Sequence, residues 1–477
     1  MAKDFVGIQI GAVSFVDEGV DQVLDILQEK GAVNALVIGA LSWSRGNAGR
    51  AILGTPDHGV SEPDDLIGGA FWEPDPRYYV NSAIKDFRAP DPLYEGFDTL
   101  RDVIPAAKKR GMRVYPYHCE TPRVTIRHSN VPNAAQIVEV DLFGRKAARP
   151  CNNNPGYRGW VFSFIEDWCN HEVDGILWGI ERQSGLKATL SGEVPTCFCR
   201  HCLSEAERRN IDAERAREGY IAVYEYLQRI KAGEQPRDGY FVTFLRILLN
   251  YPEVFHWEKM WLESHRGLHR ELAGTVKFVD PDKEIGFGIW QEINTFSPYL
   301  RAQFDYDEFR QYADWLKPIV YHVPAGARFA RYVQTFQPLL FHKHGEERAK
   351  VIQEAQAAVL RDFTSQGSLD LFYHLLHLDE ARLEQLPARG FSTEYVRRET
   401  VRTVAGVKGE VKVYPGIGIG VPGGLGTKEI EPEDVKGAIR AAYAGGADGV
   451  LLSRNYSETL LKNLEAAGQV LRDLGRA

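Results

Sequence analysis

Eight short apolar segments, separated by helix-like stretches, set the strongest limit on the fold of this chain. They cover residues 5–13, 35–41, 112–120, 173–181, 284–292, 317–323, 411–420 and 448–454. Their apolar residues are continuous rather than alternating, which is typical of parallel strands covered on both faces. Eight strand–helix units predict an α/β fold, a (β/α)8 TIM barrel with functional residues at the carboxyl ends of its strands. A doubly wound open sheet is the structural alternative.

The rhythm of strands and helices breaks once, after the fourth strand. Residues 182–283 hold three of the six cysteines and two or three charged helices. We interpret this stretch as a helical insertion within a single barrel domain that covers residues 1–477. With 44% apolar residues, a chain of this length can bury a sizeable core without disulfides.

Charge and hydropathy restrict the partners. Asp and Glu number 65 against 57 Lys and Arg, which gives a formal net charge of −8. Nucleic acids and anionic membrane surfaces select for basic patches, so we expect neither as a partner. No apolar run reaches the roughly 18 residues of a membrane span, and the first residues lack the long apolar core of a signal peptide. We therefore expect a cytoplasmic protein.

Three cysteines fall within six residues, at Cys197, Cys199 and Cys202. In a reducing compartment such a cluster indicates a metal site more often than a disulfide framework, and thiolates are the usual ligands of structural zinc. The fourth ligand could be Cys119, Cys151 or Cys169, with His201 a weaker candidate. A closed site of four cysteines leaves no position for substrate, so we expect Zn²⁺ to be structural and to pin the insertion to the barrel.

The segment that begins at Cys151 carries a resemblance to a known family. Cys151-Asn-Asn-Asn-Pro-Gly-Tyr-Arg158 is similar to the Cys-x-x-x-Pro-x-Tyr-Arg element of glycoside hydrolase family 42 β-galactosidases. In that family the element precedes a helix and barrel strand four, which ends in the acid/base glutamate, and a Cys-x-Cys-x-x-Cys cluster follows. Residues 140–205 keep this order. The resemblance implies zinc held by Cys151, Cys197, Cys199 and Cys202, Glu181 as general acid/base, a carbohydrate substrate and a homo-oligomer.

Glycoside cleavage usually needs two carboxylates, and several strands end in one. Glu181 ends the fourth strand beside Trp178, an aromatic that could raise its pKa and suit it to act as an acid. Candidates for the second carboxylate are Glu292 first, then Glu120 and Glu458, which follow the fifth, third and eighth strands. The family carries its nucleophile at the end of strand seven, where residues 411–420 contain no carboxylate.

Other polar and aromatic side chains are expected near the same ends of the strands. Aromatic faces stack on sugars, and a few placed polar groups bind their hydroxyls. The candidates for substrate binding are His58, Tyr117, His118, Trp178, Trp290, Gln291, Tyr321, His322, Arg328, Tyr414 and Arg454.

The missing carboxylate on strand seven keeps two other functions open. One is a barrel lyase or isomerase acting on a sugar acid or sugar phosphate, in which Glu181 or His322 would abstract a proton. The other is a carbohydrate-binding barrel without catalysis. The glycine-rich segment 416–426 follows strand seven, a place where barrels often bind phosphate, although backbone that turns tightly explains it equally well.

Overall fold

The computed structural model describes residues 4–43, 48–50, 57–62, 66–120, 131–340, 385–422 and 426–477. Side chains in the helix that ends at residue 340 are described up to residue 333. All statements below refer to these residues.

Nine parallel strands of the described chain form one sheet, in the order β11-β10-β9-β8-β5-β2-β1-β13-β12. Their bounds are β1 (Phe5–Gly11), β2 (Ala35–Gly39), β5 (Arg113–Cys119), β8 (Gly175–Ile180), β9 (Glu284–Ile289), β10 (Trp315–Pro318), β11 (Lys412–Val413), β12 (Gly416–Gly418) and β13 (Gly449–Ser453). β11 pairs with β10 and β12 pairs with β13, while Ile319 bridges to Gly416. β11 and β12 are therefore consecutive parts of one strand, which closes an eight-stranded (β/α)8 barrel as predicted.

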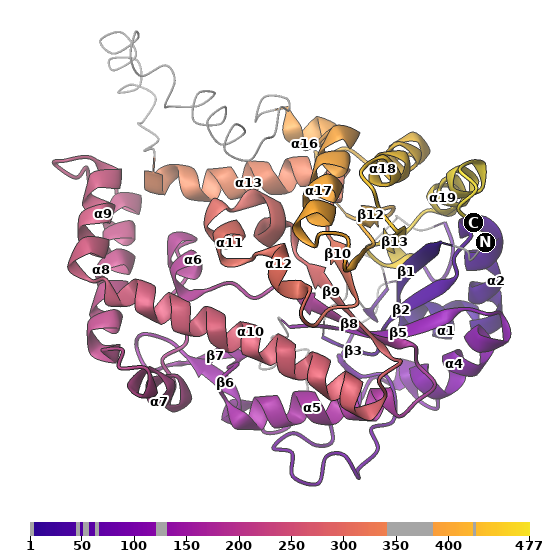
Figure 1. The fold of residues 1–477 in the computed structure, drawn as a ribbon, viewed down its shortest axis with the longest axis horizontal. Coiled ribbons are helices and arrows are strands. Elements are labelled where there is room, and N and C mark those ends of the chain that lie inside the picture. The colour runs from indigo at the N-terminus through magenta and orange to yellow at the C-terminus, as the bar shows by residue number, and fades with distance from the viewer. Residues whose placement is uncertain are drawn as a thin grey trace.

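Helices follow the strands and surround them (Figure 1). Those outside the insertion are α1 (Ala12–Glu18), α2 (Val20–Gly31), α4 (Thr99–Lys109), α5 (Pro155–Cys169), α11 (Pro298–Gln303), α12 (Tyr306–Phe309), α13 (His322–Leu340), α16 (Leu386–Arg389), α17 (Thr393–Gly406), α18 (Pro432–Ala444) and α19 (Leu461–Asp473). Local sequence sets several of their starts. The Asn154 side chain caps α5 by accepting from the backbone N–H of Gly156 at 2.9 Å, with Pro155 in the first turn.

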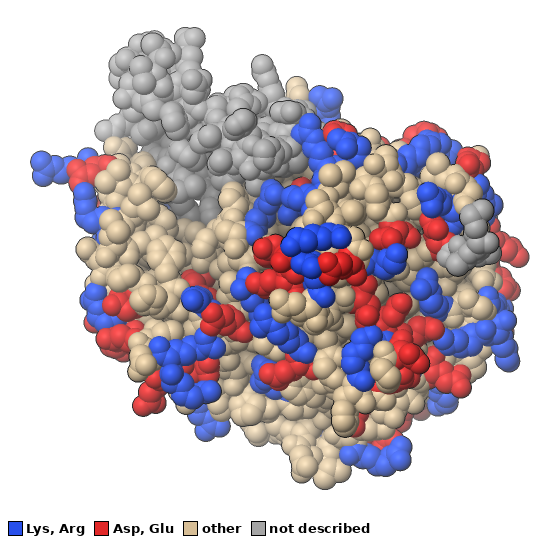
Figure 2. All heavy atoms as spheres, in the orientation of Figure 1, with Lys and Arg blue, Asp and Glu red and all other residues tan. Residues whose placement is uncertain are grey.

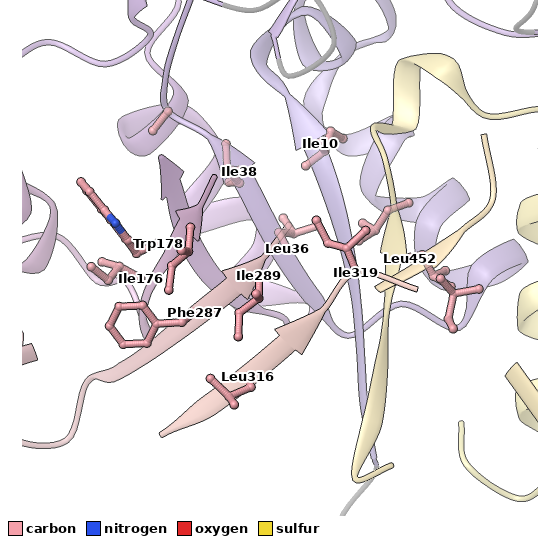
Figure 3. Close-up of a cluster of buried hydrophobic side chains, with 14 of the residues drawn as sticks. Ile10, Leu36, Ile38, Ile176, Trp178, Phe287, Ile289, Leu316, Ile319 and Leu452 are labelled. Atoms are coloured by element: carbon pink, nitrogen blue, oxygen red, sulfur yellow. The ribbon is translucent and has the colours of Figure 1, made fainter. Parts of the chain in front are cut away.

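The strands bury apolar side chains on both of their faces. Outward-facing residues pack under the helices and form the main core, with Ile38, Ile176, Trp178, Ile289 and Leu316 among them (Figure 3). Inward-facing aromatics fill the amino-terminal end of the barrel, where the rings of Phe5 and Tyr414 stack 4.1 Å apart. Nearer the carboxyl end the inward positions hold glycines such as Gly179, Gly288 and Gly416, which leave room for long polar side chains.

Five helices lie between β8 and β9. They are α6 (Gly185–Leu190), α7 (Arg200–Arg208), α8 (Ala213–Lys231), α9 (Tyr240–Asn250) and α10 (Glu253–Val279). They enclose a second apolar cluster that includes Tyr220, Tyr226 and Trp257. The last part of α10 packs beside α5 and leads back into the barrel (Figure 1).

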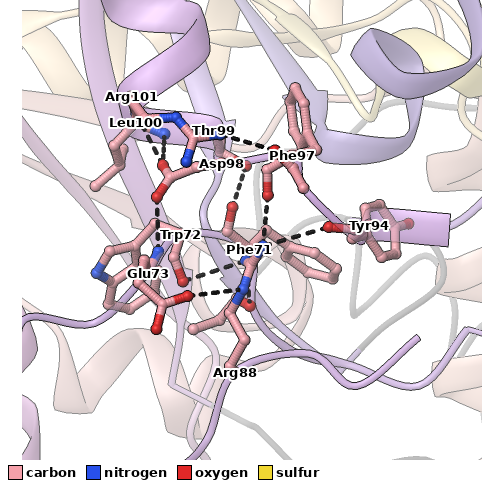
Figure 4. Close-up of polar contacts among 12 residues, drawn as sticks. Phe71, Trp72, Glu73, Arg88, Tyr94, Phe97, Asp98, Thr99, Leu100 and Arg101 are labelled. Carbon is pink, nitrogen blue, oxygen red and sulfur yellow. Dashed lines mark hydrogen bonds and ion pairs between the residues drawn. The ribbon is translucent and has the colours of Figure 1, made fainter. Parts of the chain in front are cut away.

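The connection between β2 and α4 is held by main-chain acceptors. β3 (Leu41–Ser42) and β4 (Gly69–Ala70) pair within it, and the Arg88 guanidinium donates to the carbonyl oxygens of Ala70 and Trp72, each at 3.2 Å (Figure 4). Asp98 caps α4 and also accepts from the backbone N–H of Glu73 at 2.8 Å. These bonds fix the loop against the helical layer.

One predicted element differs from the structure. The sixth strand ends at Pro318, and His322 begins α13, because Pro324 suits the first turn of a helix and not a strand interior. The helical stretch expected around residues 345–407 lies largely outside the described residues, with α16 and α17 in its last part.

No described helix is long and apolar enough to cross a membrane. On the face drawn in Figure 2, acidic and basic side chains are intermingled.

Candidate functional site

Four cysteine side chains come together between the end of the β-hairpin, which precedes α5, and the start of α7. Cys151 follows the strands β6 (Val138–Val140) and β7 (Lys146–Pro150), and Cys197, Cys199 and Cys202 lie at the start of α7. The Sγ atom of Cys151 lies 3.5 Å from those of Cys199 and Cys202, and all four sulfur atoms lie within 4.8 Å of one another. A tetrahedron of thiolates with Zn–S bonds of about 2.3 Å has edges of about 3.8 Å. The donor set therefore fits a four-coordinate metal ion.

The surroundings of the four sulfur atoms suit thiolates. The backbone N–H of Val140 points at Cys197 Sγ from 3.4 Å, and the Asn153 amide donates to Cys202 Sγ at 3.5 Å. All four cysteines are buried. The other two cysteines lie elsewhere, with Cys119 on β5 and Cys169 at the end of α5.

A buried ion pair connects this hairpin to the end of β8. The Arg182 guanidinium pairs with Glu139 on β6 and donates to the carbonyl oxygen of Pro150 at 2.6 Å. Both charged side chains are almost fully buried. The cysteine cluster and the residue after Glu181 thus belong to one rigid assembly.

The end of β5 divides the predicted residues between two environments. Successive side chains of a strand point to opposite faces, so Tyr117 and Cys119 face the barrel interior while His118 and Glu120 face the helices. The His118 ring packs on Phe164 of α5, and burial lowers its pKa to about 4. His118 therefore occupies the outer core and not the predicted substrate site.

Glu120 lies in the same outer layer, and both of its carboxylate oxygens accept hydrogen bonds. His265 and His269 of α10 approach its carboxylate at 2.7 and 3.0 Å, and the Trp178 indole N–H donates to it at 2.7 Å. Burial alone would raise the pKa of Glu120, but the two imidazoles reverse this and hold it well below its usual range. Glu120 and Trp178 thus join α10 to the barrel wall, on the side away from Glu181.

Inside the barrel, the long side chains that fill the space above the aromatic layer come from four strands. Glu181 follows β8 and is half-buried. It is close enough to influence the pKa values of Tyr117, Lys317 and Tyr321. The Lys317 ammonium donates to Gln9 Oε1 and lies 3.4 Å from the Tyr321 hydroxyl. Ser453 donates to the same Gln9 oxygen at 2.9 Å.

Lys317 has no carboxylate within ion-pair distance among the described residues, and 2% of its surface is exposed. Burial lowers its pKa to about 7, and the charge on Glu181 opposes that shift only in part. Gln9, Lys317 and Ser453 were not among the predicted site residues. The available signal was a lysine and a glutamine within otherwise apolar strands, since buried charged groups are rare without a function or partner.

Beyond this interior group, Arg328 of α13 is held between two aromatic rings. Its guanidinium carbon lies 4.9 Å from the centre of the Trp290 ring and 5.5 Å from that of Tyr321. One of its N–H groups donates to Gln291 Oε1 at 3.2 Å. Arg454 lies nearby and forms a two-point ion pair with Glu458, with Nε 2.9 Å from Oε2. The predicted residues Trp290, Gln291, Tyr321, Arg328, Arg454 and Glu458 are thus brought into one neighbourhood.

The remaining predicted residues have other surroundings. Glu292 forms a 2.6 Å ion pair with Lys187 of α6. His58 lies between Glu18 Oε1, 3.0 Å away, and the carbonyl oxygen of Thr459, and so joins two loops. His322 is buried with a pKa lowered to about 4, and Tyr414 belongs to the aromatic layer at the opposite end of the barrel. Of the glycine-rich segment 416–426, residues 423–425 lie outside the described chain.

The architecture is that of a (β/α)8 barrel with its polar groups at the carboxyl ends of the strands. No family model and no curated protein sequence matches the chain. Solved structures do match. The glycoside hydrolase domain of PgaB (BpsB) from Bordetella bronchiseptica is 12% identical with a TM-score of 0.51, over 99% of both chains.

Two β-galactosidases are similar to the same extent. That from Halorubrum lacusprofundi is 14% identical with a TM-score of 0.54, over 99% of this chain and 58% of that one. That from Marinomonas ef1 is 9% identical with a TM-score of 0.50, over 99% and 59%. The chain thus spans less than three fifths of either galactosidase. At these identities the similarity establishes the fold, a barrel shared with glycoside hydrolases.

Proposed function

We propose that this chain is a glycoside hydrolase-like enzyme in which Glu181 is the general acid/base. The observation that carries the proposal is the position of Glu181, a half-buried carboxylate at the carboxyl end of β8 beside Tyr117, Tyr321 and Lys317. Catalysis in barrels of this kind takes place at that end of the strands. The similar structures of the PgaB glycoside hydrolase domain and of a β-galactosidase support the same reaction class.

In this mechanism Glu181 gives a proton to the glycosidic oxygen as the bond from the anomeric carbon to that oxygen breaks. Water then adds to the anomeric carbon, and its proton returns to Glu181. The Trp290 ring is half-buried and has Arg328 over one face, so we propose that a sugar stacks on its other face.

We propose that the second carboxylate is Glu292 or Glu458. Each follows a barrel strand, and each is held by one cation, Lys187 for Glu292 and Arg454 for Glu458. Glu120 is a weaker candidate because its carboxylate faces α10. Azide can take the place of a missing nucleophile when a smaller side chain leaves room for it, so rescue of Glu292→Ala or Glu458→Ala would identify the residue.

We further propose that Cys151, Cys197, Cys199 and Cys202 bind Zn²⁺. Four buried sulfur donors are the usual ligand set of structural zinc, and the closed set leaves no position for substrate. When bound, the ion would hold the β6–β7 hairpin on α7. None of the six cysteines, all of which lie in the described chain, forms a disulfide, so the four sulfur atoms are available to a metal ion.

The test is a panel of chromogenic glycosides of both anomers, with product analysis. The expected result is release of the free sugar by the wild-type chain and loss of that release in Glu181→Gln. Glu172→Gln, a change at an exposed position, is the matched control. An unsaturated or isomerised sugar as product would contradict hydrolysis and favour a lyase or isomerase. Sugar binding without turnover would favour a binding protein.

A further inference from the structure

Arg328 has an environment that stacking alone does not explain. The centres of the Trp290 and Tyr321 rings lie 4.9 Å and 5.5 Å from its guanidinium carbon. Its one hydrogen bond to a described residue goes to the neutral amide of Gln291, and no described carboxylate lies within ion-pair distance. Stacking uses the faces of a guanidinium and leaves its N–H edge for a planar acceptor. Among the described residues, this edge therefore meets no group of opposite charge.

A second guanidinium lies close to the first. Burial lowers the pKa of Arg328 to about 10, and the charge on Arg454 adds to that shift. Arg454 is paired with Glu458, and a third of its side chain is exposed. Of the described charges, Arg328, Arg454 and Glu181 act on Tyr321, and the Lys317 amine, 3.4 Å from its hydroxyl, is only partly protonated at pH 7. Bringing like charges together in a half-buried site costs free energy that a bound anion would recover.

We propose that the substrate carries an anionic group, a carboxylate or a phosphate, which Arg328 binds at its free edge with Arg454 beside it. Arginine binds both groups through paired, charge-assisted hydrogen bonds. Glu181 and Trp290 lie in the same neighbourhood. A sugar stacked on Trp290 would therefore place its acidic substituent on Arg328 and its glycosidic oxygen towards Glu181. The substrate class is then an acidic sugar, a uronic acid or a phosphorylated sugar. The cleavage of such a sugar rests on the proposed function, whereas the binding of its anionic group to Arg328 does not.

The test compares matched nitrophenyl glycosides that differ in one group. Glucuronides and galacturonides are set against glucosides and galactosides, and the phosphate forms are tested as 6-phosphoglycosides. We expect kcat/KM for one acidic class to exceed that of its neutral counterpart by about 100-fold, since hydrogen bonds to charged groups contribute that much. The preferred class distinguishes carboxylate from phosphate. The preference should fall between low and high salt.

Variants of Arg328 show whether the preference for acidic substrates depends on the planar N–H edge of this arginine or only on its positive charge. Arg328→Gln should reduce the preference at least tenfold, and Arg328→Lys should keep part of it, because the charge stays while the planar edge is lost. Arg246→Gln on α9, where the arginine forms an exposed pair with Asp238, is the control and should leave it unchanged. Equal turnover of neutral and acidic glycosides would overturn the inference and leave the hydrolase proposal intact. So would a preference that survives in Arg328→Gln.

Calorimetry covers the case in which no glycoside is cleaved. Glucuronate, galacturonate and glucose 6-phosphate would be titrated against glucose and galactose. Binding of an acid that depends on Arg328 would support the inference while the hydrolase proposal fails. Absence of any preference for the acids would overturn it.

Discussion

Nε2 of His265 lies 2.7 Å from Oε2 of Glu120, and both side chains are almost completely buried. The contact joins the middle of α10 to the end of β5, and Trp178, His269 and the backbone N–H of Arg182 also donate to the carboxylate. A glutamate at the end of a barrel strand can thus serve the attachment of an inserted helix rather than the reaction.

Glu120→Gln should therefore reduce stability more than chemistry. The amide cannot accept from all the buried N–H groups that now donate to the carboxylate, and each donor left without a partner costs about 1–3 kcal/mol, so we expect a loss of about 3 kcal/mol. Urea unfolding measures it, with Glu172→Gln as the exposed control. Turnover per folded molecule should stay within a few-fold of wild type. If turnover is lost while stability is unchanged, this expectation is contradicted, and Glu120 takes part in the reaction.

Stability should fall as the pH is lowered from about 6.5 to 4. Burial lowers the pKa values of His118, His269 and His322 to about 4, below the usual value of 6.5. Between these values the unfolded chain binds protons that the folded chain does not, so acid favours unfolding. Thermal unfolding across this range should show Tm falling, and His118→Phe should flatten the dependence. An identical pH profile for this variant would contradict the placement of His118.

The four-cysteine centre predicts one zinc ion per chain. Metal analysis should find that stoichiometry, and Cys199→Ser should reduce it and lower Tm because the hairpin loses its attachment to α7. Cys169→Ser is the matched control, since this thiol is buried at the end of α5 and lies outside the cluster. Equal metal content in the two variants would argue against the site.

Lys317→Met should stabilise the fold. The pKa of Lys317 falls from 10.5 to about 7, so the folded chain releases a proton that the unfolded chain keeps until pH 10. Wild-type stability due to this group therefore rises with pH between about 7 and 10.5. The gain from methionine should be about 2 kcal/mol or more at pH 7 and should shrink towards pH 10, as chemical unfolding at several pH values would show. A gain that is constant with pH would contradict a buried, titrating amine.

Much of the barrel could be predicted because its strands are short apolar runs, and the structure confirms all eight. The helix that the family resemblance implies after Cys151 is α5, which begins at Pro155. The cysteine spacing likewise predicted three of the four possible metal ligands, and the family resemblance implied Cys151 as the fourth.

It was harder to predict whether the side chains at the strand ends point into the barrel or towards the surrounding helices. Tyr117 and Glu120 are three positions apart and lie on opposite sides of the barrel wall, because strand side chains alternate. The alternation can be read from the sequence, but which set points inward depends on the closure of the barrel. Lys317 was missed because a single lysine in an apolar strand gives no sign of its neighbours, which come from β1 and β13.

The account depends most on Glu181 as the proton donor, and Glu181→Gln tests it directly. General acid catalysis contributes about 10²–10⁴-fold when the leaving group needs a proton and little when it does not. We predict that kcat/KM of Glu181→Gln falls by about 10³-fold on a disaccharide. On the dinitrophenyl glycoside of the same sugar, whose leaving group departs unprotonated, the bond-breaking step should be nearly unaffected. Equal losses on both substrates, or no loss on either, would contradict the account.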